Sequence, residues 1–336
     1  MEFNIDRKTI KEIARDKNFT PNNVEKVLRL CIILNTINRE LTHSQELLLK
    51  GGTGINLLGF SNSPRLSVDL DLDYGYNIDK EAMQIKRSEL TELLTSRLTK
   101  AGYEVSERPR FRLDGRELRY QSVLGGKDKI KLDINYHTRS HIYPAATSMV
   151  RAPFGLMEMN VKVAHLDMAE MYGSKISALY DRCTPRDIFD IYSLATTGLL
   201  SDKPDRERIR KAAIFYSSLN DNSIIPIIEK DIYAEIKLKK FAEMRDHLMQ
   251  MMHTGLGYLD TNKICTGAID YLKDLMVFNI EEKEYIARLQ KGEIRPDILF
   301  GHDIGIRLKY HPGVLFKSRK LQMNGINQHK GKGCKM

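Results

Sequence analysis

The stretch "LLLKGGTGINLLGFSNSPRLSVDLDLDYGY", residues 47–76, decides the fold of the first half of the chain. Its opening apolar residues predict a short β-strand that ends at Gly51-Gly52, and "TGINLLGF" predicts a short helix directly after these glycines. The later "RLSVDLDLDY" alternates apolar and polar residues, which is typical of a strand with one buried face. We therefore expect a strand, a glycine turn, a helix and then a second strand.

The second strand carries aspartates at alternate positions, Asp69, Asp71 and Asp73. Residues two apart in a strand point to the same face, about 6–7 Å apart, so these carboxylates repel one another unless a cation lies between them. A divalent ion such as Mg²⁺ prefers carboxylate and phosphate oxygens and would relieve the repulsion. The alternative is an exposed strand with a solvated acidic face.

The glycine pair favours a ligand site. Between a strand and a helix, Gly51 and Gly52 let the backbone approach a ligand, and the helix N-terminus offers N–H groups to phosphate. A tight turn that requires positive φ is the alternative explanation. A phosphate cradle followed by a D-x-D pair is a rarer combination, and it predicts a site for phosphate together with a metal ion.

A further carboxylate, Asp133, lies in "KIKLDINY", where alternation places it opposite the apolar residues. If its strand lies beside residues 67–74, Asp133 joins the other aspartates. The alternative is an exposed aspartate on an amphipathic strand.

The rest of the chain predicts an α+β protein. Helical patterns cover residues 1–46 and 80–102, three more short strands follow, and helices predominate from about His165 onward. We expect the following boundaries: an N-terminal helical segment that packs on the next domain (1–46), an α+β core (47–164), a helical domain (165–316) and a basic, disordered tail (317–336).

The composition is that of a soluble globular protein, with 42% hydrophobic and 29% charged residues. No run has the length of a transmembrane helix and the N-terminus lacks the apolar core of a secretory signal, so we expect a cytoplasmic protein without a membrane partner. The four scattered cysteines predict free thiols. The net charge is +9, but six Lys or Arg and no acid lie in residues 317–336, which leaves +3 for residues 1–316. That charge permits an RNA partner without proving one.

These motifs resemble the nucleotidyltransferase-like AbiEii/AbiGii toxin family, which includes the MenT toxins of type IV toxin–antitoxin and abortive-infection systems. "LKGGTGINLLGF…PRLSVDLDLDY" is similar to the family signature KGGTxL…R-x-S-x-D-x-D. "YGSKISALYDRCTPRDIFDIYSL" is similar to the K-x-x-A-x-x-x-R…R-D-x-x-D-L block, and a fainter likeness continues in "RPDILFGHDIGIRLKYHPGVLF". Asp73 departs from the pattern, since the family often has an aromatic residue there.

The resemblance implies the fold of the polymerase β-type nucleotidyltransferase superfamily, a small mixed sheet with flanking helices, followed by a mostly helical domain. It implies an enzyme that uses Mg²⁺ or Mn²⁺ and transfers NMP from a nucleoside triphosphate to RNA. The tRNA acceptor end is the leading acceptor, and arrested translation is the implied cellular result. A cognate antitoxin is implied as partner or antagonist.

In the block that contains Lys175, a helix is predicted with Thr184 as N-cap and Pro185 as its first residue. Asp187 then falls at the third helical position, where an acid supports the cap and the helix dipole. Asp190 lies one turn later among apolar residues, so its charge requires a partner. Lys175 taken alone is more typical of a surface residue.

Together, the motifs and the resemblance assign candidate roles. We expect Gly51, Gly52 and Thr53 to cradle the triphosphate, and Arg65 and Ser67 to position phosphate or the D-x-D strand. We expect Asp69 and Asp71 to hold the metal ion.

The second block completes the expected site. Lys175 and Asp190 are implied catalytic residues, with Lys175 also contacting the triphosphate and Asp187 as a weaker nucleotide-binding member. The metal ion, or a carboxylate such as Asp133 or Asp190, is expected to activate the acceptor hydroxyl. Two alternatives remain open, a metal-dependent nuclease and a catalytically silent regulatory protein that binds RNA or a protein partner.

Overall fold

The computed structural model describes residues 5–40, 46–59, 65–108, 113–150, 154, 161–220, 223–239, 248, 252 and 260–332. The chain divides into two compact units. The first, here called the sheet unit, comprises Met1–Arg139, Tyr143–Met171 and Lys240–Thr261. The second, the helical unit, comprises Ser140–Ile142, Tyr172–Lys239 and Asn262–Met336. This organisation confirms the predicted α+β class.

The sheet unit is built on a mixed seven-stranded sheet with the strand order β3-β4-β5-β2-β1-β7-β6. Its strands are β1 (Leu47–Lys50), β2 (Leu70–Tyr74), β3 (Glu104–Glu107), β4 (Leu113–Gln121), β5 (Lys127–Asn135), β6 (Ala146–Val150) and β7 (Val161–His165). β1 and β2 pair antiparallel, whereas β2 pairs parallel with β5, and β1 with β7. The aspartate-bearing strand β2 therefore lies in the middle of the sheet, between β1 and β5.

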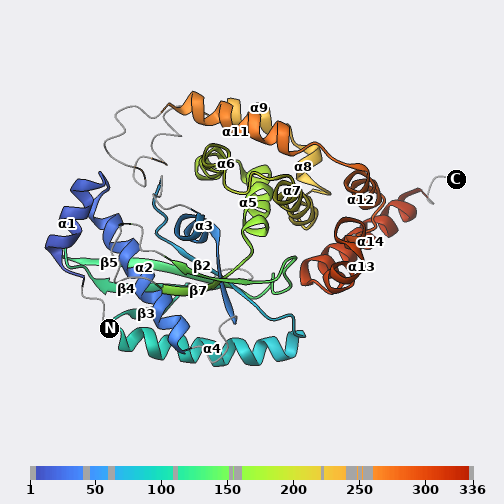
Figure 1. Ribbon diagram of the computed structural model, residues 1–336. Helices are drawn as coiled ribbons and strands as arrows, with labels where there is room; N and C mark the ends of the chain where they lie inside the picture. Colours follow the sequence, from blue (N-terminus) through green and yellow to red (C-terminus); the bar gives the residue numbers. More distant parts are fainter. Residues whose placement is uncertain are drawn as a thin grey trace. The chain divides into compact units, whose positions relative to one another are not determined.

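Helices cover both faces of this sheet. They are α1 (Arg7–Asp16), α2 (Pro21–Glu40), α3 (Gly51–Gly59) and α4 (Lys80–Lys100). Figure 1 shows α2 and α4 on one face of the sheet and α3 on the other. Local residues mark two of these helix boundaries: α2 begins at Pro21, and α4 ends just before Gly102, whose φ is +89°.

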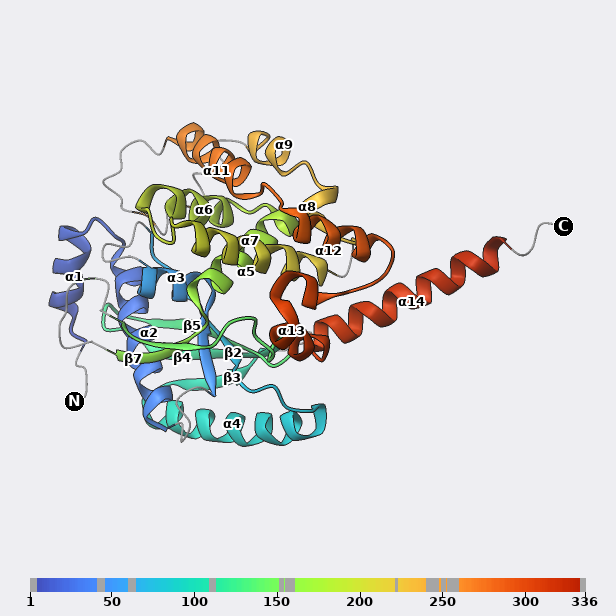
Figure 2. The ribbon, with the colours of Figure 1, turned by 45° about the vertical axis from the view of Figure 1, so that its right-hand side comes forward.

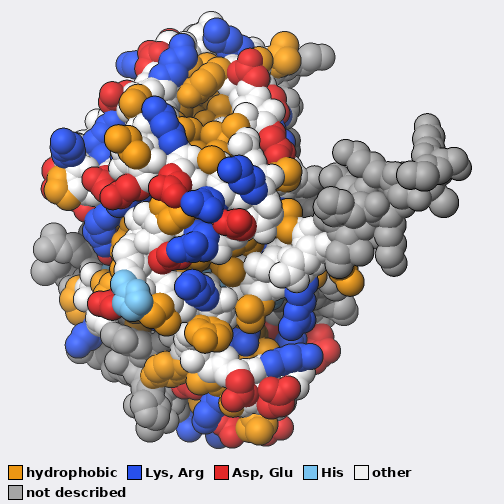
Figure 3. Space-filling model, turned by 90° about the vertical axis from the view of Figure 1, so that its right-hand side faces the viewer, with side chains coloured by type: hydrophobic (Ala, Val, Ile, Leu, Met, Phe, Trp, Pro, Cys, Tyr) orange, Lys and Arg blue, Asp and Glu red, His pale blue; other side chains and the backbone are white. Residues whose placement is uncertain are grey.

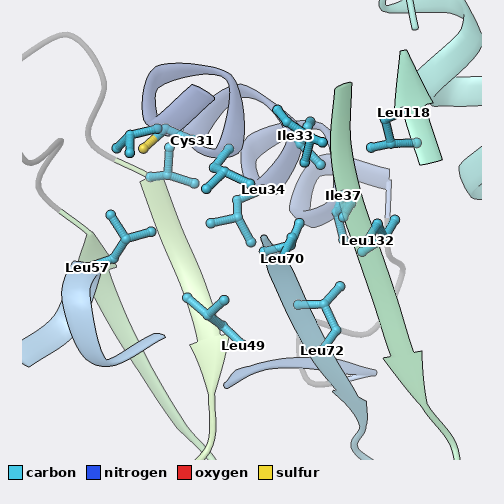
Figure 4. Packing of buried hydrophobic residues seen from close by; sticks show 14 of the residues in the cluster. Cys31, Ile33, Leu34, Ile37, Leu49, Leu57, Leu70, Leu72, Leu118 and Leu132 are labelled. Atoms are coloured by element: carbon cyan, nitrogen blue, oxygen red, sulfur yellow. The ribbon is translucent and has the colours of Figure 1, made fainter. Parts of the chain in front are cut away.

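The hydrophobic core lies between the sheet and α2 (Figure 4). Leu70 and Leu72 of β2 and Leu132 of β5 are at most 2% exposed and belong to one cluster with apolar residues of α2. Burying a leucine side chain stabilises a fold by roughly 1.5–3 kcal/mol. Since side chains alternate along a strand, Asp71 and Asp133 project from the opposite face, the one that α3 covers.

The sheet differs from the sequence prediction in two ways. The strand β4, one of the three strands predicted to be short, spans nine residues from Leu113, and the hairpin turn after it contains Gly125 and Gly126 at φ +114° and +77°. The strands β6 and β7 were not predicted, although β7 pairs with β1 through Leu49 and His165. Residues 41–45, predicted as helical, lie outside the described residues.

The helical unit consists of helices and their connections. They are α5 (Met168–Arg182), which begins in the sheet unit, α6 (Pro185–Thr197), α7 (Lys203–Ser218), α8 (Pro226–Glu229), α9 (Ile232–Lys237), α11 (Thr261–Leu275), α12 (Ile280–Gln290), α13 (Pro296–Lys309) and α14 (Pro312–Lys332). Gly173 allows α5 to approach α7 closely, because a Cβ atom there would lie 2.9 Å from the backbone nitrogen of Ala213. The boundary between the units falls inside α5, later than the predicted residue 164.

The first part of the basic tail, from Lys317, belongs to helix α14. Helix α14 continues through Lys332, and Figure 2 shows it extending outward from α13. Near its start, Lys317 is 3% exposed, and its Nζ donates hydrogen bonds to the carbonyl oxygens of Asn220 and Ser223. A buried lysine that satisfies two backbone carbonyls stabilises this end of the helix, and tail composition alone did not indicate it.

The hydropathy of the helices, the surface charges and the cysteines can be compared with the expectations from composition. Within the described part of the chain, no helix is both long and apolar enough to cross a bilayer. On the face shown in Figure 3, Lys and Arg side chains are interspersed with Asp and Glu. Of the described cysteines, Cys31, Cys183 and Cys265 are free thiols, as predicted.

Candidate active site

The turn between β1 and α3 brings the Asp71 carboxylate against the backbone. Gly51 has a φ of +68°, in the left-handed region that favours glycine. A Cβ atom at Gly51 would lie 2.5 Å from Oδ2 of Asp71. Only a residue without a side chain leaves room for this carboxylate at the start of α3.

The aspartates of the opening motif lie on neighbouring strands. Asp69 directly precedes β2, Asp71 lies within it, and both are partly exposed. Asp71 pairs in register with Lys50 of β1 and with Asp133 of β5. Paired residues of adjacent strands, about 4.8 Å apart, point to the same face. The conditional prediction that Asp133 lies beside the D-x-D strand is therefore confirmed.

Arg65 and Ser67 pack over the second glycine. A Cβ atom at Gly52 would lie 3.0 Å from Oγ of Ser67 and 3.1 Å from Nη2 of Arg65. Arg65 is only 3% exposed, and its Nη1 donates to the Leu66 carbonyl oxygen at 3.1 Å. This burial fits the predicted role of positioning the turn and the D-x-D strand better than an open contact with phosphate.

Thr53 joins the two halves of the motif. Its side chain is 1% exposed, and its hydroxyl donates to the carbonyl oxygen of Asp69. The first turn of α3 is thereby fixed to the residue before β2. The Thr53 hydroxyl is therefore engaged within the protein, and the predicted contact of Thr53 with phosphate stays a prediction.

Asp73, the third aspartate of the opening motif, has a structural role. Asp73 is 2% exposed, and its Oδ1 lies 2.5 Å from Nζ of Lys50 and accepts a hydrogen bond from Oγ1 of Thr138 at 2.9 Å. A buried carboxylate requires such partners. Lys50 was not among the predicted site residues, although it ends an apolar strand just before the glycine pair.

Asp133 also has a cationic partner that the sequence analysis missed. Nη2 of Arg108 forms an ion pair with Oδ1 of Asp133, and the two side chains are 19% and 12% exposed. Arg108 follows β3 and is 25 residues away in sequence, so no local pattern could have revealed this pair.

The donor set near the glycine turn fits a hard divalent cation. Carboxylate oxygens are the ligands that Mg²⁺ prefers, and it commonly uses one or two of them together with substrate phosphates and water. Asp69 and Asp71 supply two such carboxylates, and among the described residues the Asp69 carboxylate has no hydrogen-bond or ion-pair partner. No group of three or more His, Cys, Asp or Glu residues able to hold a metal exists within the described ranges.

In the helical unit, Lys175 of α5 is held by two aspartates of α6. Its Nζ lies 3.1 Å from Oδ1 of Asp187 and 2.9 Å from Oδ2 of Asp190. Lys175 is 11% exposed, so it is not the open surface residue that its sequence context alone favoured. We call Lys175, Arg182, Asp187 and Asp190 the lysine cluster. The structure brings together the three predicted members of this block.

Asp187 is the most enclosed member of the lysine cluster. Its side chain is 0% exposed, and it accepts hydrogen bonds from Arg182 at 2.7 and 2.9 Å and from the N-cap Thr184 at 2.5 Å. Burial alone would raise the pKa of Asp187, but the Arg182 hydrogen bonds and the charge of Lys175 outweigh it and hold that pKa well below its usual range. These contacts explain Asp187 as a structural residue, and its nucleotide-binding role stays a prediction.

A separate cavity of about 630 Å³ lies in the sheet unit between the end of β2 and α4. Its lining includes Tyr74, Tyr76 and Leu90. Tyr74 and Asp71 are three residues apart on one strand, so their side chains point to opposite faces of the sheet. This cavity is therefore distinct from the glycine turn.

Comparisons with known proteins identify the family of the chain. The family described as "Nucleotidyl transferase AbiEii toxin, Type IV TA system" matches residues 32–260, more than half of the 336-residue chain. No curated protein sequence matches significantly.

Two solved structures were matched to the fold of the chain. The chain is similar to "MenT4, nucleotidyltransferase toxin Rv2826c from Mycobacterium tuberculosis H37Rv", with a TM-score of 0.62 and 13% identity over 95% of this chain and 99% of that one. The Cid1 poly(U) polymerase with bound MgGTP matches 94% of each chain at 13% identity. Its TM-score of 0.27 is too low to indicate a shared fold. The MenT4 similarity confirms the nucleotidyltransferase-type fold.

Proposed function

Since the chain belongs to the AbiEii nucleotidyl transferase toxin family of type IV toxin–antitoxin systems, we propose that it transfers NMP from a nucleoside triphosphate to RNA. The family makes the chain a nucleotidyltransferase of a toxin–antitoxin system. The proposal adds the acceptor, the metal and the residues. We propose the tRNA acceptor end as acceptor, arrested translation as the result, and a cognate antitoxin as partner or antagonist.

One observation carries the proposed site, the Asp71 carboxylate lying against Gly51 at the N-terminus of α3. The backbone N–H groups at that helix start, at Gly52 and Thr53, suit phosphate oxygens. Asp69 and Asp71 would hold Mg²⁺ or Mn²⁺ next to them. When bound, the cation offsets negative charge on the attacking and leaving oxygens of the displacement.

The reaction is an in-line displacement at the α-phosphorus. A hydroxyl oxygen of the acceptor RNA forms a bond to this phosphorus while the bond to the β-phosphate oxygen breaks, and pyrophosphate leaves. The hydroxyl proton passes to a carboxylate, for which Asp133 and Asp190 are the candidates. Arg65 and Ser67 hold the turn and the D-x-D strand in place for this step.

We extend the proposal to Lys175 as the cation that offsets charge on the β- and γ-phosphates. Support comes from the family resemblance and from the ion pairs with Asp190 and Asp187, which fix the direction of the ammonium group. Lys175→Ala should weaken nucleotide binding in an equilibrium titration. An unchanged nucleotide affinity would return Lys175 to a structural role.

The test combines the full-length protein, Mg²⁺, labelled NTP and total RNA, and compares the wild type with Asp69→Ala. The proposal predicts label on RNA of undiminished length with the wild type and none with Asp69→Ala. Shortened RNA without label would indicate a nuclease instead. Neither labelling nor shortening, with equal RNA binding by both proteins, would indicate a catalytically silent RNA-binding protein.

A further inference from the structure

The strand β6 forms one edge of the seven-stranded sheet, and in the described part of the chain it pairs with β7 alone. Native proteins usually protect such an edge with charged residues or proline, because its unpaired backbone groups can bind a strand of another chain. The five residues of β6, Ala146–Val150, include neither a charge nor a proline. The side chains of β6 therefore do not oppose pairing with a further strand.

The hydrogen bonds of β7 show which of its backbone groups point away from β6. Just after β7, the Leu166 N–H donates to the Leu49 carbonyl oxygen of β1 at 3.1 Å. The Lys162 carbonyl oxygen accepts a hydrogen bond from Nδ2 of Asn38 in α2 at 2.6 Å. Because backbone groups alternate in direction along a strand, the even-numbered residues of β7 point away from β6.

Two residues of β6 consequently direct their backbone N–H and C=O groups to the open edge. Met149 is the register partner of Lys162. Thr147, the partner of Ala164, occupies the equivalent position. Among the residues that the structure describes, 146–150 form no backbone hydrogen bond outside the ladder with β7, and none of them has a further interaction.

The side chains of β6 divide in the same way. Oγ of Ser148 lies 2.9 Å from Nε2 of the buried His165, so the face with Ser148 packs onto the protein. Thr147 is exposed on the other face, and Met149 is 57% exposed. The residues with outward backbone groups thus also carry the accessible side chains.

A second copy of β6 is complementary to this edge. In an antiparallel pair centred on Ser148, a two-fold axis places Thr147 of one copy opposite Met149 of the other. Residues with outward backbone groups then face each other and exchange both of their N–H···O=C bonds. No charged side chains meet in this pairing, since β6 has none.

The opposite edge of the sheet, β3, does not share this property. Glu104 and Glu107 lie at its two ends, and both are exposed. Antiparallel pairing of β3 with itself would place Glu104 of one copy opposite Glu107 of the other, and like charges in that position are destabilising. Self-pairing therefore favours β6 over β3.

We infer that the protein forms a two-fold symmetric dimer through β6, in which the two sheets join into one. The inference goes beyond the proposed function and does not depend on it. A single pair of short strands is smaller than a standard protein interface, so we expect a dissociation constant of roughly 10–100 μM.

The test is sedimentation velocity of the full-length protein at concentrations up to about 500 μM, several times the expected dissociation constant. Thr147→Lys combined with Met149→Lys places lysine opposite lysine on both sides of the axis and should weaken the dimer at least about tenfold. Thr147→Lys combined with Met149→Glu changes the same positions but places opposite charges together. It should keep the dissociation constant within about threefold of the wild type.

Two further samples complete the set. Thr147→Glu combined with Met149→Glu should be monomeric alone and should form a heterodimer when mixed with the variant that carries two lysines. Ile85→Lys alters a 62% exposed apolar side chain of α4, away from β6, and is the control for lost surface hydrophobicity. It should leave the dissociation constant within about twofold of the wild type.

Three results would overturn the inference. The first is a wild-type protein that stays monomeric at about 500 μM. The second is a dimer that the variant with two lysines leaves intact, or that Ile85→Lys weakens as much, since its interface would lie elsewhere. The third is equal loss of the dimer in the lysine–lysine and lysine–glutamate variants, because the antiparallel register predicts opposite results for them.

Discussion

Aspartates are placed in opposite ways in the two units of this molecule. In the sheet unit, Asp69 and Asp71 are partly exposed, and Gly51 leaves space for the Asp71 carboxylate at a helix N-terminus. In the helical unit, Asp187 is 0% exposed and is held by Lys175, Arg182 and Thr184. A carboxylate enclosed by protein cations stabilises the fold, whereas carboxylates gathered at an accessible glycine turn are suited to an external cation. Under the proposed function, Asp69 and Asp71 hold the metal ion, whereas Asp187 stabilises the fold.

The largest expected effect separates chemistry from stability. Asp71→Asn keeps the shape of the side chain but removes a charge that the metal ion needs. Nucleotidyl transfer should fall by about 10³-fold, which corresponds to roughly 4 kcal/mol of transition-state stabilisation. Urea unfolding should change by less than about 1 kcal/mol, because Asp71 is partly exposed and asparagine keeps the shape of its side chain. Near-normal transfer by Asp71→Asn would remove the distinction between the two units.

The second prediction tests the enclosed aspartate. Asp187→Asn leaves Arg182 and Lys175 without their buried carboxylate partner and should lower the free energy of unfolding at pH 7 by about 3 kcal/mol. The measurement is urea denaturation monitored by circular dichroism. A loss below about 0.5 kcal/mol would show that the lysine cluster does not stabilise the helical unit.

The pH dependence of that loss has a definite sign. The pKa of Asp187 is lowered in the folded protein, because the Arg182 hydrogen bonds and the charge of Lys175 outweigh the effect of burial. Its contribution is therefore fully present above the unfolded carboxyl pKa of about 3.9 and is lost progressively as the pH falls from there toward the lower folded value. The difference between wild type and Asp187→Asn should be smaller at pH 3 than at pH 7. A difference that grew on acidification would contradict the assignment.

A third prediction compares two glycines of positive φ. Gly51 and Gly102 have φ of +68° and +89°, but only at Gly51 would a Cβ atom meet the Asp71 carboxylate. Gly51→Ala should reduce transfer about 30-fold, or roughly 2 kcal/mol, because the carboxylate must move. Gly102→Ala shares the backbone strain, so it should cost about 1 kcal/mol of stability and leave transfer unchanged. Equal activities of the two variants would show that the contact with Asp71 is irrelevant to the reaction.

The smallest expected effect concerns Arg182, whose side chain is 57% exposed. Solvent screens its ion pair with Asp187, so Arg182→Ala should lower the free energy of unfolding by about 1 kcal/mol. The value comes from the same urea titration as for Asp187→Asn. A loss as large as that of Asp187→Asn would mean that Arg182, rather than Lys175, is the main partner of the buried carboxylate.

The local parts of this structure could be predicted from the sequence. Alternation in β2 and β5 gave the strands and the face that carries Asp71 and Asp133. The Thr184 cap and the position of Asp187 at the start of α6 follow from local helix chemistry. Strand alternation and helix caps depend on residues only a few positions apart, so they can be recognised directly in the sequence.

Long-range partners could not be predicted in this way. Lys50 reaches Asp73, and Arg108 reaches Asp133, only because non-adjacent segments meet in one sheet. The strand β7 reads as a short apolar segment, and its parallel pairing with β1 depends on the whole topology. The tail composition suggested disorder, yet burial of Lys317 against two distant carbonyl oxygens holds the start of α14.

The central claim, that this chain transfers a nucleotidyl group at the Asp69 and Asp71 site, is tested most directly by the position of the label. Wild-type protein is incubated with Mg²⁺, RNA and each NTP labelled either at the α-phosphate or at the γ-phosphate. The account predicts that α-label joins the RNA, that γ-label leaves as pyrophosphate, and that Asp69→Ala abolishes both. Transfer of γ-label to RNA, or α-label incorporation that Asp69→Ala leaves intact, would contradict it.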